Sequence, residues 1–242
     1  ELCDMIRFAQ SLGLKVALKP TVNCDNGVWR ARISFFDHDV PCEPKWGNWF
    51  ESHIAFQKHY AQIAQRTGCE LFLTGCEMTM TEHRETEWRK LIAEVRTVYD
   101  GPVGYNCDKY GEDHITWWEA VDVIASSGYY PIDDWENQLD RIEEVVKKYQ
   151  KPFLFSEAGC MNIHGSAQVP NNWELRGEED DAEQADWYLA MFSACEKRDW
   201  VKGFGIWDWP GSMERKSPYA VCDRPAEAVI AEEYSCRGKN RR

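Results

Sequence analysis

Two kinds of apolar pattern alternate along the whole sequence. In one, apolar residues recur every three to four positions, as in a helix; the other is a short continuous run, as in a buried strand. The first helical pattern is Leu2–Leu12, and strands are then expected at Lys15–Pro20, Leu71–Thr74, Val103–Asn106, Val121–Ser127, Phe153–Phe155 and Val201–Trp207. Further helices are expected at Trp46–Arg66, Thr81–Asp100, Trp135–Tyr149, Glu178–Arg198 and Pro225–Tyr234. This alternation predicts an α/β fold with a parallel sheet.

Polar residues follow nearly every predicted strand, which favours a (β/α) barrel over an open, doubly wound sheet. Neither a GxGxxG nor a GxxxxGK[ST] motif follows a strand pattern, so nucleotide binding of those two kinds is not indicated. No linker or low-complexity segment interrupts the 242 residues. We therefore expect one domain covering residues 1–242, although this length would also accommodate two small domains.

A glutamate follows two of the predicted strands. Glu77 comes shortly after Leu71–Thr74, and Glu157 comes shortly after Phe153–Phe155, 80 residues further on. The carboxyl ends of the strands form the catalytic face of a (β/α) barrel, so we expect both carboxylates at one site. Two carboxylates that flank a glycosidic bond suffice to hydrolyse it, one as nucleophile or base and the other as acid. Either glutamate alone could equally be an ordinary surface residue.

The composition restricts the partners of the protein. Its formal net charge of −13 argues against nucleic acid and anionic membranes, because both need basic patches. A neutral polymer or a small molecule suits this charge better. The chain has 12 Trp, 10 Tyr and 10 Phe, and aromatic rings in polar surroundings suit sugars, whose C–H groups pack against a ring face. Most of these rings are nevertheless expected in the core.

The ten cysteines are expected to be free thiols, because no CxxC motif occurs and several lie in apolar segments. Free thiols are typical of a reducing compartment, and the sequence opens on a helical pattern and not on a signal peptide. We therefore expect a cytoplasmic protein. Secretion is the alternative if an N-terminal segment is missing. No apolar run approaches the length of a membrane span.

The histidines show no metal-binding spacing, and we expect neither a metal nor a cofactor. His53 and His59 are six residues apart on one predicted helix, and we expect both at its polar surface. His164, in the polar stretch after Glu157, is a candidate substrate contact.

Several stretches resemble a known group of enzymes. Leu73–Glu77, Leu154–Gly159 and Gly205–Trp209 look like strands 4, 7 and 8 of the clan A retaining glycosidases. Over nearly its whole length the chain more closely resembles glycoside hydrolase family 113, the β-mannanase family. This likeness is carried further by Leu18–Pro20, Trp29–Arg30, Trp46–Phe50, Trp88–Ile92 and Gly128–Pro131.

The resemblance implies a TIM-type (β/α) barrel that is incomplete, with strands 3 to 8 in six βα units and no counterpart of the first strand–helix–strand portion. It implies that Glu77 is the acid/base and Glu157 the nucleophile, with no cofactor. Implied substrate-site residues are Tyr129 or Tyr130 as donor to the Glu157 carboxylate, Trp207 as floor of the reacting-sugar subsite, and Asn106, Lys19 and Trp29. Clan A enzymes usually have Asn where this chain has Cys76, so the contact to the sugar 2-hydroxyl must come from elsewhere.

The leading hypothesis is a retaining β-glycoside hydrolase that cleaves β-1,4-linked mannan, manno-oligosaccharides or related β-glycosides. The alternative is a non-catalytic carbohydrate-binding barrel that has kept the sugar site, which the missing front of the barrel favours. An aldolase- or isomerase-type barrel would need a strand-end lysine or a phosphate-binding glycine loop, and only Lys19 fits the first. The sequence does not distinguish mannose from glucose, xylose or galactose, nor exo from endo action.

Six strands of an eight-stranded barrel leave two sheet edges unpaired. These edges are Val16–Leu18 and Gly203–Ile206, and both are apolar. Exposed apolar edges pair with other chains or aggregate. We therefore expect either a longer natural protein or self-association through the open side, and we favour a truncated form that associates as a homodimer, because two-fold assemblies are the commonest.

Overall fold

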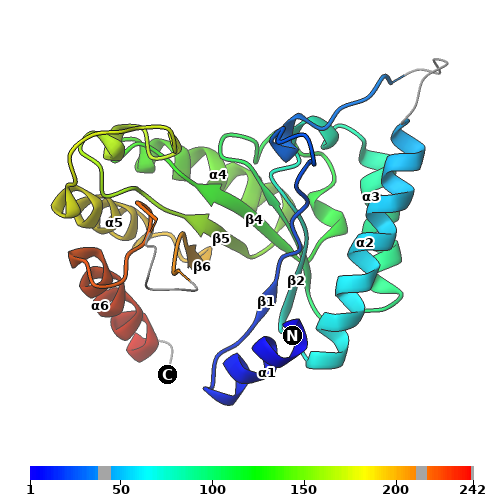
Figure 1. Cartoon of the computed structure of the whole chain (residues 1–242), viewed down its shortest axis with the longest axis horizontal. Helices are drawn as coiled ribbons and strands as arrows, with labels where there is room; N and C mark the ends of the chain where they lie inside the picture. The colour runs from blue at the N-terminus through cyan, green and yellow to red at the C-terminus, as the bar shows by residue number, and fades with distance from the viewer. Residues whose placement is uncertain (38–44, 211–216, 241–242) are drawn as a thin grey trace. The chain divides into compact units, whose positions relative to one another are not determined.

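The structure is a computed structural model that describes residues 1–37, 45–210 and 217–240, of which 237–240 are described by their backbone alone. Its strands are β1 (Ala17–Leu18), β2 (Leu71–Cys76), β3 (Val103–Cys107), β4 (Val123–Gly128), β5 (Phe153–Ala158) and β6 (Val201–Ile206). Its α-helices are α1 (Leu2–Ser11), α2 (Trp46–Thr67), α3 (Glu85–Arg96), α4 (Trp135–Tyr149), α5 (Asp181–Cys195) and α6 (Pro225–Asn240) (Figure 1). Short 3₁₀ turns are η1 (Arg30–Arg32), η2 (Thr79–Thr81), η3 (Trp118–Ala120) and η4 (Ser166–Gln168).

The strands follow one another in chain order, β1-β2-β3-β4-β5-β6, and the β1–β2, β2–β3, β3–β4 and β5–β6 pairs are parallel. Helices or 3₁₀ turns connect successive strands, as parallel pairing requires. The fold is thus the expected incomplete TIM-type (β/α) barrel with six strands.

The chain divides into two compact units. Unit 1 comprises Glu1–Ser126 and Tyr149–Pro152, and unit 2 comprises Ser127–Lys148 and Phe153–Arg242. Strand β4 begins in unit 1 and ends in unit 2, so the boundary crosses a strand and is not a linker. The expectation of a single domain stays a prediction.

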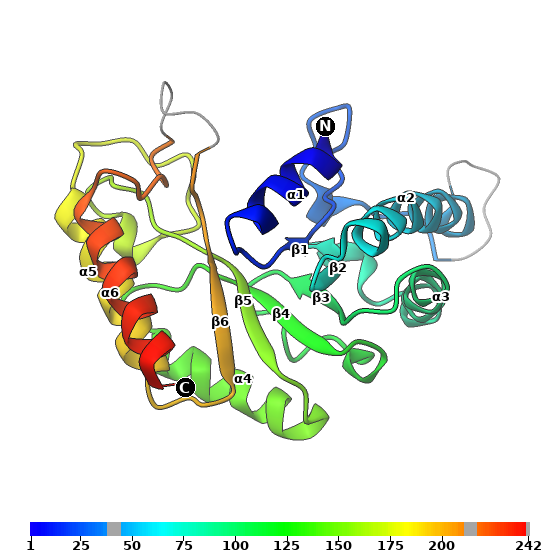
Figure 2. The ribbon, with the colours of Figure 1, turned by 90° about the horizontal axis from the view of Figure 1, so that it is seen from below.

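Unit 1 has an aromatic core beneath helices α2 and α3, which lie side by side (Figure 2). Trp88 of α3 is fully buried and stacks on Trp117 with ring centroids 5.1 Å apart. Tyr105 of β3 packs against both rings, at 4.8 and 5.0 Å. The apolar residues of α3 recur at helical spacing, which is why one face of this helix is buried.

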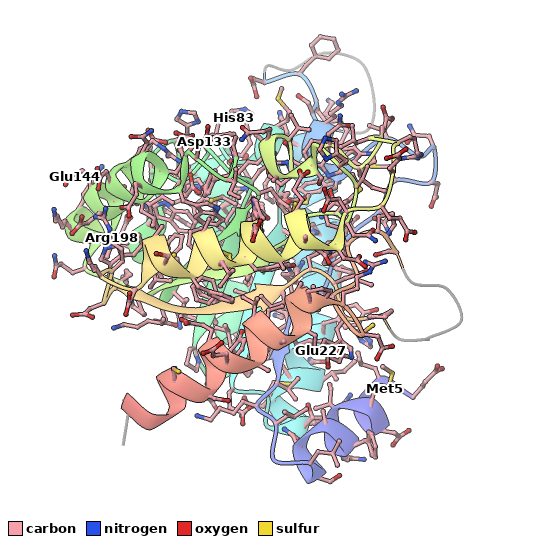
Figure 3. All side chains as sticks on the ribbon, turned by 90° about the vertical axis from the view of Figure 1, so that its left-hand side faces the viewer. Met5, His83, Asp133, Glu144, Arg198 and Glu227 are labelled. Atoms are coloured by element: carbon pink, nitrogen blue, oxygen red, sulfur yellow. The ribbon has the colours of Figure 1, made fainter. Side chains whose placement is uncertain are left out.

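Unit 2 has a second aromatic core, and its helices α5 and α6 lie side by side (Figures 1 and 2). Trp135 of α4 packs against Phe155 of β5 at 5.5 Å and against Trp187 of α5 at 5.4 Å. At the surface, Arg198 (Figure 3) forms ion pairs with three acidic side chains of α4: Glu136, Asp140 and Glu143, at 3.0, 2.6 and 2.8 Å.

Two expectations about local structure are wrong. The first strand was expected to be a buried run over Lys15–Pro20, but β1 is only Ala17–Leu18, with Ala17 exposed and Leu18 partly buried. An end strand of the sheet has a described neighbour on one side only, which the apolar pattern cannot reveal. Helix α3 begins at Glu85, not at Thr81, because Thr81 lies in η2 and its hydroxyl donates to the Met78 carbonyl at 2.7 Å.

His53 also departs from expectation, since only 4% of its surface is exposed. It lies on the buried face of α2, which recurs at helical spacing through Phe50, His53, Gln57, Ala61 and Ala64. Apolar periodicity assigns only apolar residues to an inner face, so it places such polar residues outside.

Nine cysteines lie in the described residues, and all nine are free, six of them buried. The tenth, Cys42, lies outside the described residues. Among the described residues, no helix has the length and apolar character that a membrane span requires.

Candidate active site

Glu77 stands directly after β2 with its side chain almost completely buried. Its backbone N–H donates to the carbonyl of Asn106 at 2.8 Å, which ties the end of β2 to the end of β3. Its φ is +52°, in the left-handed region that residues other than glycine seldom adopt. Such conformations cost roughly 1–3 kcal/mol and gather at functional sites.

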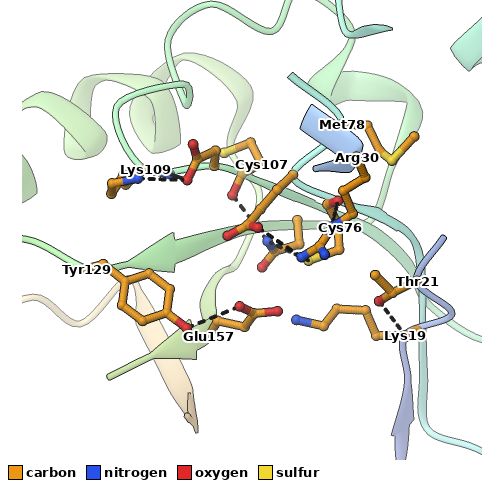
Figure 4. Close-up of polar contacts among 12 residues, drawn as sticks. Lys19, Thr21, Arg30, Cys76, Met78, Cys107, Lys109, Tyr129 and Glu157 are labelled. Atoms are coloured by element: carbon orange, nitrogen blue, oxygen red, sulfur yellow. Dashed lines mark hydrogen bonds and ion pairs between the residues drawn. The ribbon is translucent and has the colours of Figure 1, made fainter. Parts of the chain in front are cut away.

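Arg30 of η1 holds the end of β2 in two ways (Figure 4). Its Nη2 forms an ion pair with Glu77 Oε2 at 2.9 Å, and its Nε donates to the Cys76 carbonyl at 2.8 Å. Arg30 Nη2 also lies 3.4 Å from Cys76 Sγ. The planar guanidinium therefore fixes both the backbone before Glu77 and the carboxylate itself.

Glu157 is the second-to-last residue of β5 and is also almost completely buried. Its Oε2 accepts a hydrogen bond from the Tyr129 hydroxyl at 3.2 Å, as the dashed line in Figure 4 shows. Tyr129 follows directly after β4 and packs edge-on against Tyr219, whose hydroxyl donates to the Pro170 carbonyl at 2.7 Å. Tyr129 is thereby held in place to orient the carboxylate.

Trp207 follows β6 and leaves 45% of its surface exposed. Its backbone N–H donates to the Ala158 carbonyl at 2.8 Å, and the Trp207–Asp208 peptide bond is cis. A Cβ on Gly159 would clash with the Trp207 carbonyl oxygen, so only glycine fits beside this backbone. A half-exposed indole ring next to the strand that carries Glu157 is a suitable surface for a sugar ring.

Comparison with known proteins identifies the family. The sequence model of Glycoside Hydrolase Family 113 matches residues 1–224. The chain belongs to glycoside hydrolase family 113. As a member of this family it is a glycoside hydrolase.

Solved structures of this family are similar to the chain. A family 113 β-1,4-mannanase solved as a complex is 56% identical, with a TM-score of 0.93 over 97% of this chain and 78% of that one. The family 113 β-mannanase AaManA from Alicyclobacillus acidocaldarius, in complex with ManMIm, is 43% identical, with a TM-score of 0.91 over 97% and 77%. A β-D-glucuronidase of Dictyoglomus thermophilum (19% identity, TM-score 0.71, 96% and 42% covered) shares the fold alone. No curated protein sequence matched the chain.

The other substrate-site residues expected from the family 113 resemblance lie in varied surroundings. Asn106 is fully buried, and its Nδ2 donates to the Cys107 carbonyl at 3.2 Å and lies 3.7 Å from Cys76 Sγ. Tyr130 is fully buried against Trp135, so of the two tyrosines it is Tyr129 that contacts Glu157. Lys19 and Trp29, on the segment after β1, are both partly buried. Sugar contacts by these residues stay predictions.

His164 lies at the surface of unit 2, where its Nδ1 is 3.2 Å from both Asp180 Oδ2 and Glu183 Oε2. The hydrogen bond to Asp180, with the nearby charge of Glu183, raises the pKa of His164. These three residues have the spacing of a metal site. Glu183, however, also accepts from the backbone N–H groups of Gly165 and Ala167, at 2.8 and 2.7 Å, so the cluster already serves to fasten this loop.

Two residues of the Glu77 surroundings were not singled out from the sequence. One is Arg30, although the stretch Trp29–Arg30 carries part of the family resemblance. The other is Glu82, which is 8% exposed and accepts from the Tyr105 hydroxyl at 2.7 Å. The same hydroxyl accepts from the backbone N–H of Met78 at 3.1 Å, so Tyr105 connects Glu82 to the residue after Glu77. A buried acid among aromatic residues leaves no periodic signal in the sequence.

Burial raises the pKa of Glu82 to about 8, opposed by the hydrogen bond from Tyr105 and aided by the charges of Asp108, Glu112 and Glu77. The folded protein therefore keeps a proton on Glu82 up to about pH 8. The unfolded chain releases this proton above pH 4.5, the ordinary pKa of a glutamate side chain. Stability falls as pH rises from that value to about 8.

Glu82→Gln keeps an acceptor for Tyr105 and removes this titration. We expect its free energy of unfolding, relative to the native protein, to rise by about 2–4 kcal/mol between pH 5 and pH 8. Urea unfolding at the two pH values measures this change. A difference between the two proteins that does not depend on pH would show that Glu82 is ionised in the folded state.

Proposed function

We propose that the protein is a retaining β-glycoside hydrolase that cleaves β-1,4-linked mannan or manno-oligosaccharides by double displacement. The observation that carries the proposal is the pair of nearly buried glutamates at the carboxyl ends of β2 and β5, each held by a fixed donor. The family 113 relatives at 43–56% identity are β-mannanases, which supports the choice of sugar.

In the first step Glu157 attacks the anomeric carbon, the bond to the leaving oxygen breaks, and Glu77 gives that oxygen a proton. In the second step water attacks the covalent glycosyl-enzyme, Glu77 takes the proton of the water, and Glu157 leaves as a carboxylate. Retention by this route requires the two carboxyl groups to be about 5–5.5 Å apart. The Tyr129 hydroxyl keeps one oxygen of Glu157 hydrogen-bonded and so directs the other toward the sugar.

Glu77 must change its protonation state between the two steps. The ion pair with Arg30 stabilises the carboxylate form, which is the form that acts as base on water in the second step. We infer that Arg30 also fixes the direction of the Glu77 side chain, because its second contact, to the Cys76 carbonyl, anchors it to the backbone. Trp207 supplies the ring surface under the reacting sugar, while Lys19, Trp29, Asn106 and Tyr130 complete the proposed substrate-binding set.

The stereochemistry of the first product tests the mechanism. Proton NMR during hydrolysis of β-1,4-mannohexaose is expected to show the β-anomer of the new reducing end first, with the α-anomer appearing by mutarotation. Initial release of the α-anomer would mean inversion and would overturn the proposal. A parallel panel of aryl β-mannoside, glucoside, xyloside and galactoside ranks the sugars, and binding without any hydrolysis would favour the non-catalytic alternative.

We further propose that the protein associates with a second copy through the open side of its sheet. Helix α1 and its C-cap residue carry exposed apolar side chains next to β1 in sequence: Met5 (Figure 3), Phe8 and Leu12, each 63–67% exposed. Exposed apolar area of this kind marks an interaction surface. Light scattering is expected to give about twice the chain mass of 28.2 kDa. Phe8→Lys should shift the mass to that of a monomer, and a native protein that is already a stable monomer would disprove this assembly.

A further inference from the structure

Unit 1 contains a cavity of about 380 Å³ that is separate from the surroundings of Glu77 described above. Two parts of the chain form it: the segment after β1, with Asn23 and Asp25, and the first half of α2, with Trp49, Ser52, His53 and Phe56. The volume lies at the lower end of the range of about 300–1,000 Å³ that small-molecule sites occupy. It is therefore large enough for a small ligand.

His53 lines this cavity from the buried face of α2. Its ring stacks on Trp49 with centroids 4.7 Å apart and on Phe56 at 6.0 Å, and only 4% of its surface is exposed. Its Nε2 has no hydrogen-bond partner among the described residues. Burial lowers the pKa of His53 to about 4, so the ring is neutral near pH 7. That nitrogen is itself buried, so a ligand in the cavity meets the ring of His53 and not its Nε2.

The chemistry of the lining selects among ligand classes. A purely apolar ligand would cover Asn23 and Asp25 without satisfying their hydrogen bonds. An anion would meet the Asp25 carboxylate within a chain of net charge −13. A sugar, by contrast, offers C–H groups to the rings of Trp49 and Phe56 and hydroxyls to the polar groups.

We propose that this cavity is a second carbohydrate site, which holds a neutral sugar unit of the polysaccharide away from the catalytic glutamates. The proposal rests on the proposed function for the identity of that sugar. The segment that forms one wall runs on, within a few residues, to Arg30, which pairs with Glu77. A sugar bound at Asn23 and Asp25 would thus contact the same segment that carries Arg30.

A variant that fills the cavity tests this proposal. Ser52 is exposed and lines the cavity, so Ser52→Trp occupies it with little expected effect on folding. Glu51→Trp is the matched control, because Glu51 is exposed on the same helix and does not line the cavity. We expect Ser52→Trp to lose at least fivefold in kcat/KM on polymeric β-mannan and to equal native protein on an aryl β-mannoside. Glu51→Trp is expected to equal native protein on both.

Direct binding separates this inference from the proposed function. In the Glu157→Gln background, which prevents hydrolysis, β-1,4-mannohexaose is expected to shift the His53 imidazole ¹⁵N resonances, assigned with His53→Gln. Ser52→Trp should abolish that shift, and this result would support the site even if native protein hydrolysed no mannoside. No shift, or an equal shift in Ser52→Trp, would overturn the site even if native protein proved an active mannanase.

Discussion

Glu157→Gln is expected to lower kcat on every β-mannoside by about four orders of magnitude, which corresponds to about 5.4 kcal/mol of barrier. The amide is no nucleophile, yet it has the shape of the carboxylate and keeps an oxygen to accept from Tyr129, now 3.2 Å away. The fold should therefore survive, as judged by an unchanged thermal midpoint. Initial rates on an aryl β-mannoside measure the loss. Because the first step itself fails, a good leaving group should not restore activity.

Azide distinguishes the nucleophile from other essential groups. It should leave Glu157→Gln inactive, because the amide still occupies the space beside the anomeric carbon. In Glu157→Gly that space is open, and azide is expected to attack an aryl β-mannoside directly and give the α-mannosyl azide, with inverted configuration. The β-azide from Glu157→Gly would contradict the assignment, since it would show that a covalent intermediate still forms without Glu157.

The positions of the two glutamates follow from local sequence signals. A short apolar run bounded by glycine or proline fixes where a buried strand ends, and in a parallel sheet all carboxyl ends lie at the same edge. Such runs placed β2 and β5 to within a few residues, and the order of the strands then followed from their alternation with helices. The two candidate catalytic glutamates could thus be placed at the carboxyl ends of their strands without knowing any tertiary contact.

The group that holds Glu77 could not be predicted in the same way. Arg30 reaches Glu77 from an irregular segment that precedes it by 47 residues, and irregular backbone has no periodic pattern. Similarly, His53 and Gln57 lie on the buried face of α2, and a pattern that counts only apolar residues does not assign them to that face. Such polar residues become informative only when the structure shows what surrounds them.

Glu77→Ala is expected to separate substrates by their leaving groups. On β-1,4-mannohexaose, whose leaving sugar needs a proton, kcat/KM should fall by about 10²–10⁴-fold. On 2,4-dinitrophenyl β-mannoside, whose leaving phenolate needs none, kcat/KM should change by less than about tenfold, since general acid catalysis contributes little there. Steady-state kinetics on the two substrates measure this contrast. Glu70→Gln is a matched control at the other end of β2, where the side chain accepts from the Val16 N–H.

Removal of Glu77 also leaves Arg30 without its carboxylate partner, and this structural cost has to be separated from lost proton transfer. Glu77→Gln keeps an oxygen for Arg30 and should show the same leaving-group contrast. Azide should accelerate turnover of the aryl substrate by Glu77→Ala and yield the β-mannosyl azide, because it intercepts the covalent intermediate in place of water. An equal loss on both substrates, in both variants, would mean that Glu77 positions other groups and does not transfer the proton. The β-azide, together with a kcat/KM on the aryl substrate within about tenfold of the native value, would instead support Glu77 as the acid/base opposite Glu157.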